Sequence, residues 1–156
     1  VRPAAAQPVG LAPSPGGATD LVVSVGNFDI GETRSTPAIG VEVRNDFGWY
    51  GIGPAAGVLV TGHGATYVHA GFHAEWGTRR VRVHGHLALG GYARGDGKDL
   101  GGVFEFREAI GLAYRATDEV QIGLQFAHIS NGDLFDRNPG VEDLQLMFSI
   151  PLREAW

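Results

Sequence analysis

From Leu21 onward, short runs of alternating apolar and small or polar residues fill the chain, and clusters of Gly, Asn, Asp and Pro separate them. Alternation with a period of two puts successive side chains on opposite faces of a strand, so the pattern predicts strands joined by turns. We expect eight strands, at residues 21–30, 36–45, 48–60, 66–76, 80–92, 102–115, 119–130 and 141–152. No helical stripe of useful length competes with them.

The expected connections between the strands alternate in length. Residues 45–47, 77–79 and 116–118 form tight links, whereas 31–35, 93–101 and 131–140 form longer loops and 61–65 is intermediate. Short turns at one end and longer loops at the other are typical of an up-and-down barrel that crosses an outer membrane. The sequence therefore predicts an all-β fold, an eight-stranded antiparallel up-and-down transmembrane β-barrel over residues 21–156. Residues 1–20, which are rich in Ala, Pro and Gly, are expected to form a tail before it.

The two faces of the expected strands differ in composition. On the sixth strand one face carries Phe104, Phe106 and Ile110, while the other carries Arg107 among small residues. A narrow eight-stranded interior is filled by polar side chains, so the large apolar residues should face lipid. An aromatic girdle would lie near the short turns, at Trp49, Tyr50, Trp76 and Tyr114. The alternative is a soluble barrel of lipocalin type, but its outer face should be rich in Lys, Glu and Ser, and the chain has one Lys.

The composition narrows the class of protein further. The chain has 156 residues with 17 acidic and 12 basic side chains, which suits one domain and, without a basic cluster, argues against a nucleic-acid partner. The absence of Cys excludes disulfides, thiolate metal sites and Cys nucleophiles. No apolar run is long enough for a membrane-spanning helix. Because the chain begins with Val1 and has no basic-then-apolar leader, we interpret it as a mature or trimmed form whose export signal, if any, has been removed.

The last two expected strands carry the groups with the clearest chemical meaning. His128 and Ser130 share the apolar face of the seventh strand, and Glu142 begins the apolar face of the eighth. One loop joins these antiparallel neighbours, so the three side chains should meet on the outer wall near the membrane surface. A hydroxyl, an imidazole and a carboxylate together can activate a serine nucleophile. The alternative is a polar rim where the strands leave the hydrocarbon.

The residues around these three positions resemble a known family. His128-Ile129-Ser130-Asn131-Gly132 is followed by Asn138-Pro139-Gly140-Val141-Glu142, which resembles the His-x-Ser-Asn and Asn-x-Gly-x-Glu segments of outer-membrane lipid A 3-O-deacylases of the PagL type. Outside residues 126–152 the likeness is architectural. The resemblance implies a serine ester hydrolase of the bacterial outer membrane that removes the 3-linked hydroxyacyl chain of lipid A, in lipopolysaccharide, without a cofactor.

The resemblance also implies roles for individual residues. Ser130 would be the nucleophile, His128 the base and Glu142 the orienting acid. Asn138, and less directly Asn131, would support the oxyanion, since a preorganised amide N–H stabilises the charge that develops in acyl transfer. Asp136 and Arg137 have no counterpart in the family pattern.

Two further groups of residues have both a functional and a structural interpretation. Phe126, Leu124 and Leu144 lie below the three polar groups and would line a groove for an acyl chain, or they are ordinary lipid-facing residues. Inward histidines pair on neighbouring strands, at His69 and His73 and at His84 and His86, while His63 lies in a loop. Such pairs can bind Zn or Cu, but in a narrow barrel they more often hydrogen-bond to one another, so no metal is expected.

Three classes of function therefore follow from the sequence. The first is the deacylase, whose partners would be lipid A and the membrane. The second is a structural or adhesive small barrel without catalysis, and the third is another lipid enzyme such as an acyl transferase. A homodimer is left open.

Overall fold

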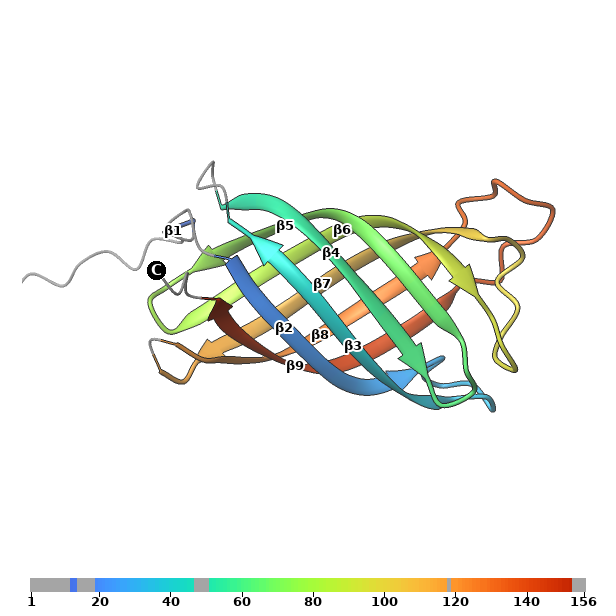
Figure 1. Ribbon diagram of the computed structural model, residues 1–156, viewed down its shortest axis with the longest axis horizontal. Coiled ribbons are helices and arrows are strands. Elements are labelled where there is room, and N and C mark those ends of the chain that lie inside the picture. The colour runs from blue at the N-terminus through green and yellow to red at the C-terminus, as the bar shows by residue number, and fades with distance from the viewer. Residues whose placement is uncertain (1–11, 14–18, 47–50, 118, 153–156) are drawn as a thin grey trace, which may run out of the picture.

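The computed structural model describes residues 12–13, 19–46, 51–117 and 119–152, and within them it is an all-antiparallel β-barrel without helices (Figure 1). The long strands are β2 (Thr19–Phe28), β3 (Thr36–Asn45), β4 (Ile52–Thr61), β5 (Thr66–Gly77), β6 (Val81–Ala93), β7 (Phe104–Arg115), β8 (Gln121–Ser130) and β9 (Val141–Leu152). Each pairs with its sequence neighbour, and β9 pairs with β2, so eight strands close the barrel. The described ranges contain no helix with the length and hydropathy needed to span a membrane.

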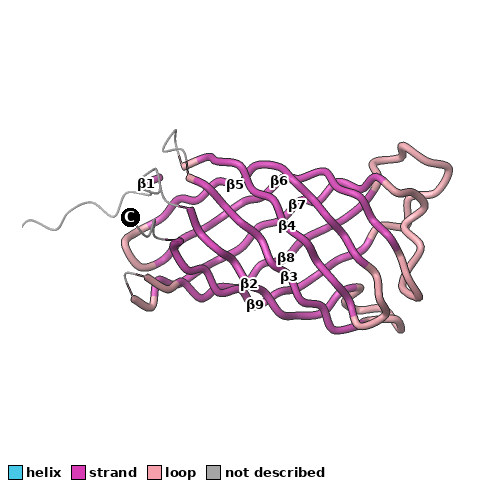
Figure 2. The backbone as a smooth tube through the Cα atoms, in the orientation of Figure 1, coloured by secondary structure: helices cyan, strands magenta, loops and turns pink. Residues whose placement is uncertain are grey.

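The strands tilt around the barrel and place the loops in two sets (Figure 2). The longer connections gather at one end, and the tight turns gather at the other end, where β2 begins and β9 ends (Figures 1 and 2). This arrangement confirms the eight-stranded up-and-down barrel that the alternation predicts.

Strand boundaries differ from the sequence expectation by a few residues at both ends of the barrel. β2 begins at Thr19, so the boundary expected after residue 20 falls inside a strand. A short strand β1 (Ala12–Pro13) pairs with Gly77 and Trp76 of β5, within the stretch expected to be a tail. β4 begins at Ile52, and the expected positions 48–50, with Trp49 and Tyr50 of the aromatic girdle, lie outside the described residues. Pairing with neighbours, which a single-strand pattern does not reveal, sets these ends.

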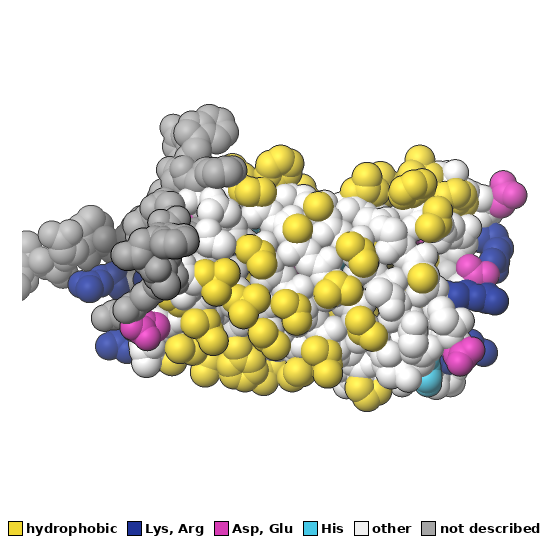
Figure 3. All heavy atoms as spheres, in the orientation of Figure 1, with side chains coloured by type: hydrophobic (Ala, Val, Ile, Leu, Met, Phe, Trp, Pro, Cys, Tyr) yellow, Lys and Arg dark blue, Asp and Glu magenta, His cyan; other side chains and the backbone are white. Residues whose placement is uncertain are grey.

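Side-chain exposure identifies the face that meets lipid. Leu87 is 65% exposed and Ile110 62%, whereas Glu105 is 0% and His84 1% exposed. Figure 3 shows hydrophobic side chains spread over the wall and charged ones at its two ends. Such an apolar outer band is that of a transmembrane barrel, so the lipocalin-type alternative is wrong.

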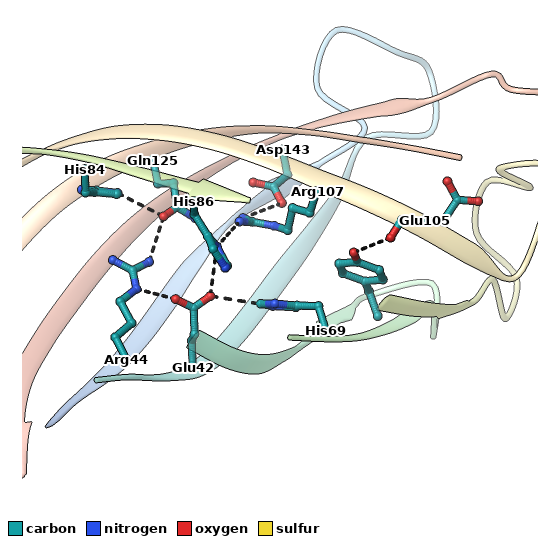
Figure 4. A network of polar contacts seen from close by, with 10 residues as sticks. Glu42, Arg44, His69, His84, His86, Glu105, Arg107, Gln125 and Asp143 are labelled. Atoms are coloured by element: carbon teal, nitrogen blue, oxygen red, sulfur yellow. Dashed lines mark hydrogen bonds and ion pairs between the residues drawn. The ribbon is translucent and has the colours of Figure 1, made fainter. Parts of the chain in front are cut away.

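Polar side chains fill the middle of the interior (Figure 4). Arg44 forms an ion pair with Glu42 and donates from Nη2 to Gln125 Oε1 at 3.0 Å. Arg107 pairs with Asp143, with 3.4 Å between Nη2 and Oδ2. These bonds satisfy groups that burial would otherwise leave at a large cost.

Towards the loop end the interior becomes apolar. The buried cluster there consists of Phe28, Ala38, Leu59, Ala65, Tyr67, Tyr92, Leu100, Ile129 and Val141. Ile129 and Val141 are register partners on β8 and β9 and are both fully buried. Because side chains alternate along a strand, burying these two residues turns their polar neighbours outward.

Candidate active site

His128 and Glu142 face each other on the outer wall at the loop end of the barrel. They are register partners on β8 and β9, and 3.2 Å separates His128 Nδ1 from Glu142 Oε1. Both side chains are 43% exposed. Ser130 lies two residues along β8 on the same face and is half-buried. The structure thus brings His128 and Glu142 into contact and puts Ser130 beside them, but no hydrogen bond joins Ser130 to His128 among the contacts of the described residues.

The loop between β8 and β9 is held by two asparagines. Asn131 is fully buried, and its Nδ2 donates to the carbonyl oxygens of Leu100 at 2.9 Å and Arg137 at 2.8 Å. Its backbone N–H donates to Asn138 Oδ1 at 3.0 Å, and Asn138 Nδ2 donates to Asp133 Oδ1 at 3.2 Å. An amide has two N–H donors, so Asn131 has used both on the loop and Asn138 keeps one.

An ion pair outside the membrane-spanning strands ties this loop to the one before β7. Asp99 accepts from the backbone N–H of Gly101 at 2.9 Å and from Arg137 Nη2 at 2.6 Å. The Gly101 N–H and the Arg137 guanidinium favour the charged carboxylate and lower the pKa of Asp99 below its ordinary value. Arg137, which had no counterpart in the family pattern, therefore acts in loop structure.

Gly140 packs against the edge of the His128 ring. Its φ is +60°, and a Cβ built there would lie 2.9 Å from His128 Cε1. Gly132, at the other end of the same loop, also has a φ of +60°, but its added Cβ would come no closer than 3.4 Å, to Phe106. The backbone conformation favours glycine at both positions. At Gly140 the absence of a Cβ also leaves the space in which the His128 imidazole lies.

Alanine variants of these two glycines distinguish two effects, namely backbone strain, which both variants should show, and displacement of the His128 imidazole, which only one should show. Gly140→Ala and Gly132→Ala should each lower the free energy of unfolding by about 1–2 kcal/mol, because alanine is strained in the left-handed conformation. Only Gly140→Ala should also lower the ester hydrolysis that the sequence resemblance implies, by about tenfold to a hundredfold, because it moves His128. Initial rates of both folded variants on lipid A, the substrate that the resemblance implies, provide the measurement, and equal rates would mean that the contact with Gly140 has no catalytic consequence.

A groove of about 540 Å³ extends from His128 across the outer wall. Its lining comes from β4 to β8 and consists of Ile52, Phe72, His73, Ala74, Trp76, Gly85, His86, Leu87, Glu108, Ala109, Ile110, Phe126 and His128. Ala74 and Gly85 are register partners, and a Cβ added to Gly85 would meet only the Ala109 carbonyl oxygen, at 3.9 Å. These small residues leave the space that the groove occupies.

The groove differs from the one expected from the sequence. Phe126 lines it, but Leu124 lines a separate depression and Leu144 lines neither. The physical reason is that small residues on β5 and β6 leave room on the wall. The groove therefore runs across the strands toward β5, and not along the apolar rows of β8 and β9.

Glu108 is a candidate site residue that the sequence interpretation did not single out. It is the register partner of His128 on β7, opposite the side on which Glu142 lies, and it is exposed in the groove. Its signal in the sequence is a lone carboxylate in the outward row of Phe106 and Ile110. Ionisable groups on a lipid-facing wall are costly and generally functional.

Inside the barrel, Glu42, His69 and His86 form the one candidate metal cluster among the described residues. Each offers one ligand atom, and these atoms lie within 4.8 Å of one another. However, Arg44 binds Glu42, and Arg107 Nη1 lies 3.3 Å from His86 Nδ1 (Figure 4). A ring nitrogen that accepts from arginine has no lone pair left for a metal, and two guanidinium groups repel a cation. The cluster therefore fits a hydrogen-bonded interior better than a metal site.

Comparisons with known proteins agree with this fold and with the position of the site. Residues 32–151 match the family Lipid A 3-O-deacylase (PagL). A segment of 52 residues, 33% of the chain, is 36% identical to "Lipid A deacylase PagL" of Bordetella bronchiseptica, and it covers 29% of that relative. The matched segment thus spans less than a third of the length of this relative.

Solved structures show the same architecture. The crystal structure of the outer membrane enzyme PagL superposes with a TM-score of 0.65 at 22% identity, covering 85% of this chain and 99% of that one. A de novo designed transmembrane β-barrel gives 0.66 at 10% identity, over 88% of this chain and 97% of the design. Neisserial surface protein A gives 0.64 at 9% identity, over 86% and 96%. At these identities the likeness establishes the fold alone.

The fold and the apolar wall define an eight-stranded β-barrel of the outer membrane. Because the family match covers well over half of the chain, the protein belongs to the lipid A 3-O-deacylase (PagL) family. None of these similarities supports the homodimer that the sequence left open.

Proposed function

We propose that this barrel hydrolyses the 3-linked hydroxyacyl ester of lipid A with Ser130 as nucleophile, His128 as base and Glu142 as orienting acid. The observation that supports this most is the 3.2 Å contact between His128 Nδ1 and Glu142 Oε1 on the face that Ser130 shares. The family match supplies the substrate class. The roles of the three residues rest on their chemistry and position.

In the proposed reaction the His128 ring takes the proton of the Ser130 hydroxyl while the serine oxygen attacks the acyl carbonyl carbon. The tetrahedral intermediate collapses, the ester C–O bond breaks, and the imidazolium returns the proton to the leaving sugar oxygen. Water then attacks the acyl-enzyme with the same base, releasing the hydroxy fatty acid and restoring Ser130. Glu142 holds the Nδ1–H and stabilises the imidazolium that forms.

Asn138 is the better of the two candidates for oxyanion support. Its remaining amide N–H is not consumed by Asp133, whereas both donors of Asn131 bind loop carbonyls. Asn131 accordingly supports the reaction by fixing the loop that carries Asn138. Such preorganised donors stabilise developing charge because they need no rearrangement during the reaction.

A site on the outer wall suits a substrate that stays in the bilayer. The hydrocarbon chain of the lipid would lie in the groove that begins at His128 and passes Phe126 and Ile110 to Gly85. The apolar lining matches an acyl chain, and the polar groups stand at the membrane surface, where the ester of a lipid headgroup lies.

Filling the groove should change chain-length preference. Gly85→Leu puts a side chain into the groove and should lower kcat/KM for long acyl chains by about tenfold or more, because a few methylene groups lose their contacts. Short-chain esters should be little affected. Gly91→Leu is the matched control, since Gly91 also faces outward on β6, its added Cβ meets nothing within 4 Å, and it lies outside the groove. Equal chain-length profiles for the two variants would contradict the groove assignment.

The direct test of the function is to incubate the purified barrel with lipid A in detergent and to record mass spectra. Loss of one hydroxyacyl group supports the deacylase. A gained or exchanged chain would indicate a transferase instead, and unchanged lipid A under conditions where the barrel is folded would indicate a barrel without catalysis.

A further inference from the structure

We infer that the turn end of the barrel carries a binding site for an anionic phospholipid, with arginines that hold its phosphate and an apolar depression that holds its chain. This site lies at the end of the barrel away from His128. It does not depend on the proposed hydrolase activity.

Two neighbouring turns are fastened together at this end. The backbone N–H of Arg115 donates to the carbonyl oxygen of Arg80 at 2.8 Å, and Arg80 Nη1 donates to Tyr114 Oη at 3.0 Å. Within the turns, Thr78 Oγ1 accepts from the backbone N–H of Val81 and Thr117 Oγ1 accepts from that of Val120, each at 3.0 Å. These hydrogen bonds fix the backbone of the described turn residues relative to one another.

Between the turns lies a cavity of about 590 Å³ lined by Arg79, Arg80, Arg115, Ala116 and Thr117. Its described lining has three guanidinium groups and no carboxylate; Glu119, in the same turn, does not line it. In the described part of the chain, by contrast, five other arginines pair with carboxylates, namely Arg44, Arg82, Arg94, Arg107 and Arg137.

Three like charges around one cavity repel one another, and an anion bound between them reduces this repulsion. The guanidinium fork matches the oxygens of a phosphate group with two parallel hydrogen bonds, more closely than a lysine would. The chain as a whole is acidic, with 17 acidic and 12 basic residues, so the positive charge of this cavity is opposite in sign to the net charge of the chain.

An apolar depression of about 380 Å³ lies near this end of the barrel, on the outer wall of β6 to β9. Its lining is Val81, Leu112, Ala113, Tyr114, Ile122, Gly123, Leu124 and Leu146. Val81 follows Arg80 in the chain and Tyr114 precedes Arg115, so the linings of the charged cavity and of the apolar depression meet at consecutive residues at the turn ends of β6 and β7. A molecule with a phosphate at one end and a hydrocarbon chain at the other fits both, which identifies a phospholipid in preference to free phosphate.

The positions of the two sites indicate which leaflet of the membrane supplies the phospholipid. His128 and Glu142 lie at the long-loop end, and the arginine cavity lies among the short turns at the opposite end. Arginines near an anionic lipid surface strengthen binding to it. The phospholipid would therefore come from the leaflet at the turn end, and not from the leaflet that holds the substrate of the proposed hydrolase.

Binding of defined lipids to the purified full chain tests the inference. We expect phosphatidylglycerol to bind about tenfold or more tightly than phosphatidylcholine with the same acyl chains, measured by native mass spectrometry from detergent. Inorganic phosphate should bind far more weakly than phosphatidylglycerol. Equal binding of the two lipids would overturn headgroup recognition, and phosphate that binds as tightly as phosphatidylglycerol would overturn the role of the depression.

A pair of double variants then locates the site. Arg79→Gln/Arg115→Gln should abolish the preference for phosphatidylglycerol, whereas Arg34→Gln/Arg94→Gln, which removes two arginine charges at the loop end, should keep it. If both doubles keep or both lose the preference, the turn-end site is wrong. The comparison of lipids on the parent chain needs no variant, so the inference stays testable even if one double folds poorly. Lipid A hydrolysis is a separate assay, and its absence would leave this result unaffected.

Discussion

Replacing Ser130 with alanine is expected to lower release of hydroxy fatty acid from lipid A by at least about ten-thousandfold. Without the hydroxyl no acyl-enzyme can form, and the residual rate comes from binding and from whatever stabilises the oxyanion. The variant should still fold, because Ser130 is half-buried at the end of β8 and the cluster that anchors this strand contains its neighbour Ile129. Mass spectra of lipid A incubated with parent and variant give both rates.

The matched control for this substitution is Ser35→Ala. Ser35 is an exposed serine in the loop between β2 and β3, at the same end of the barrel, so the same atom is removed at a position outside the groove. It should hydrolyse lipid A at the parental rate. Should purified Ser130→Ala work as fast as the parent, Ser130 is not the nucleophile.

The barrel could be predicted because one periodicity determined both its strands and its orientation. Alternation along β7 puts Phe106 and Ile110 outside and Glu105 and Arg107 inside, as the structure confirms. The expected bounds of β3 and β9 agree with the observed ones. The start of β2 differed because Thr19 and Asp20 join the sheet through their pairing with β3 and β9, which is not written in their own side chains.

Only those parts of the site that lie on strands joined by a single loop could be predicted from the sequence. His128 and Glu142 lie on strands joined by one loop, so their proximity followed from the topology. Glu108 and Gly85 reach the site through the registers of β7 and β6, and the arginines of the turn end meet across two separate turns. A sequence without a basic cluster can therefore still form one in space. The role of Asn131 also depended on loop carbonyls that no motif reveals.

The second large effect is expected from Glu142→Ala, which should lower hydrolysis by about a hundredfold to a thousandfold. The loss should be smaller than that of Ser130→Ala, because nucleophile and base remain in place while the imidazole loses its orientation and its counter-charge. Rates of both variants on the same lipid A preparation decide the order. Equal losses in the two variants would mean that Glu142 does more than orient His128.

Glu108→Ala is the matched comparison for this effect. Glu108 and Glu142 flank His128 from the two neighbouring strands, but only Glu142 lies within hydrogen-bond distance of Nδ1 among the contacts of the described residues. If the hydrogen bond matters and not merely a nearby negative charge, Glu108→Ala should lose less than about tenfold, since Glu108 makes no hydrogen bond to the imidazole among the contacts of the described residues and so does not orient it. A loss as large as that of Glu142→Ala would instead assign the imidazole two acidic partners, one from each side.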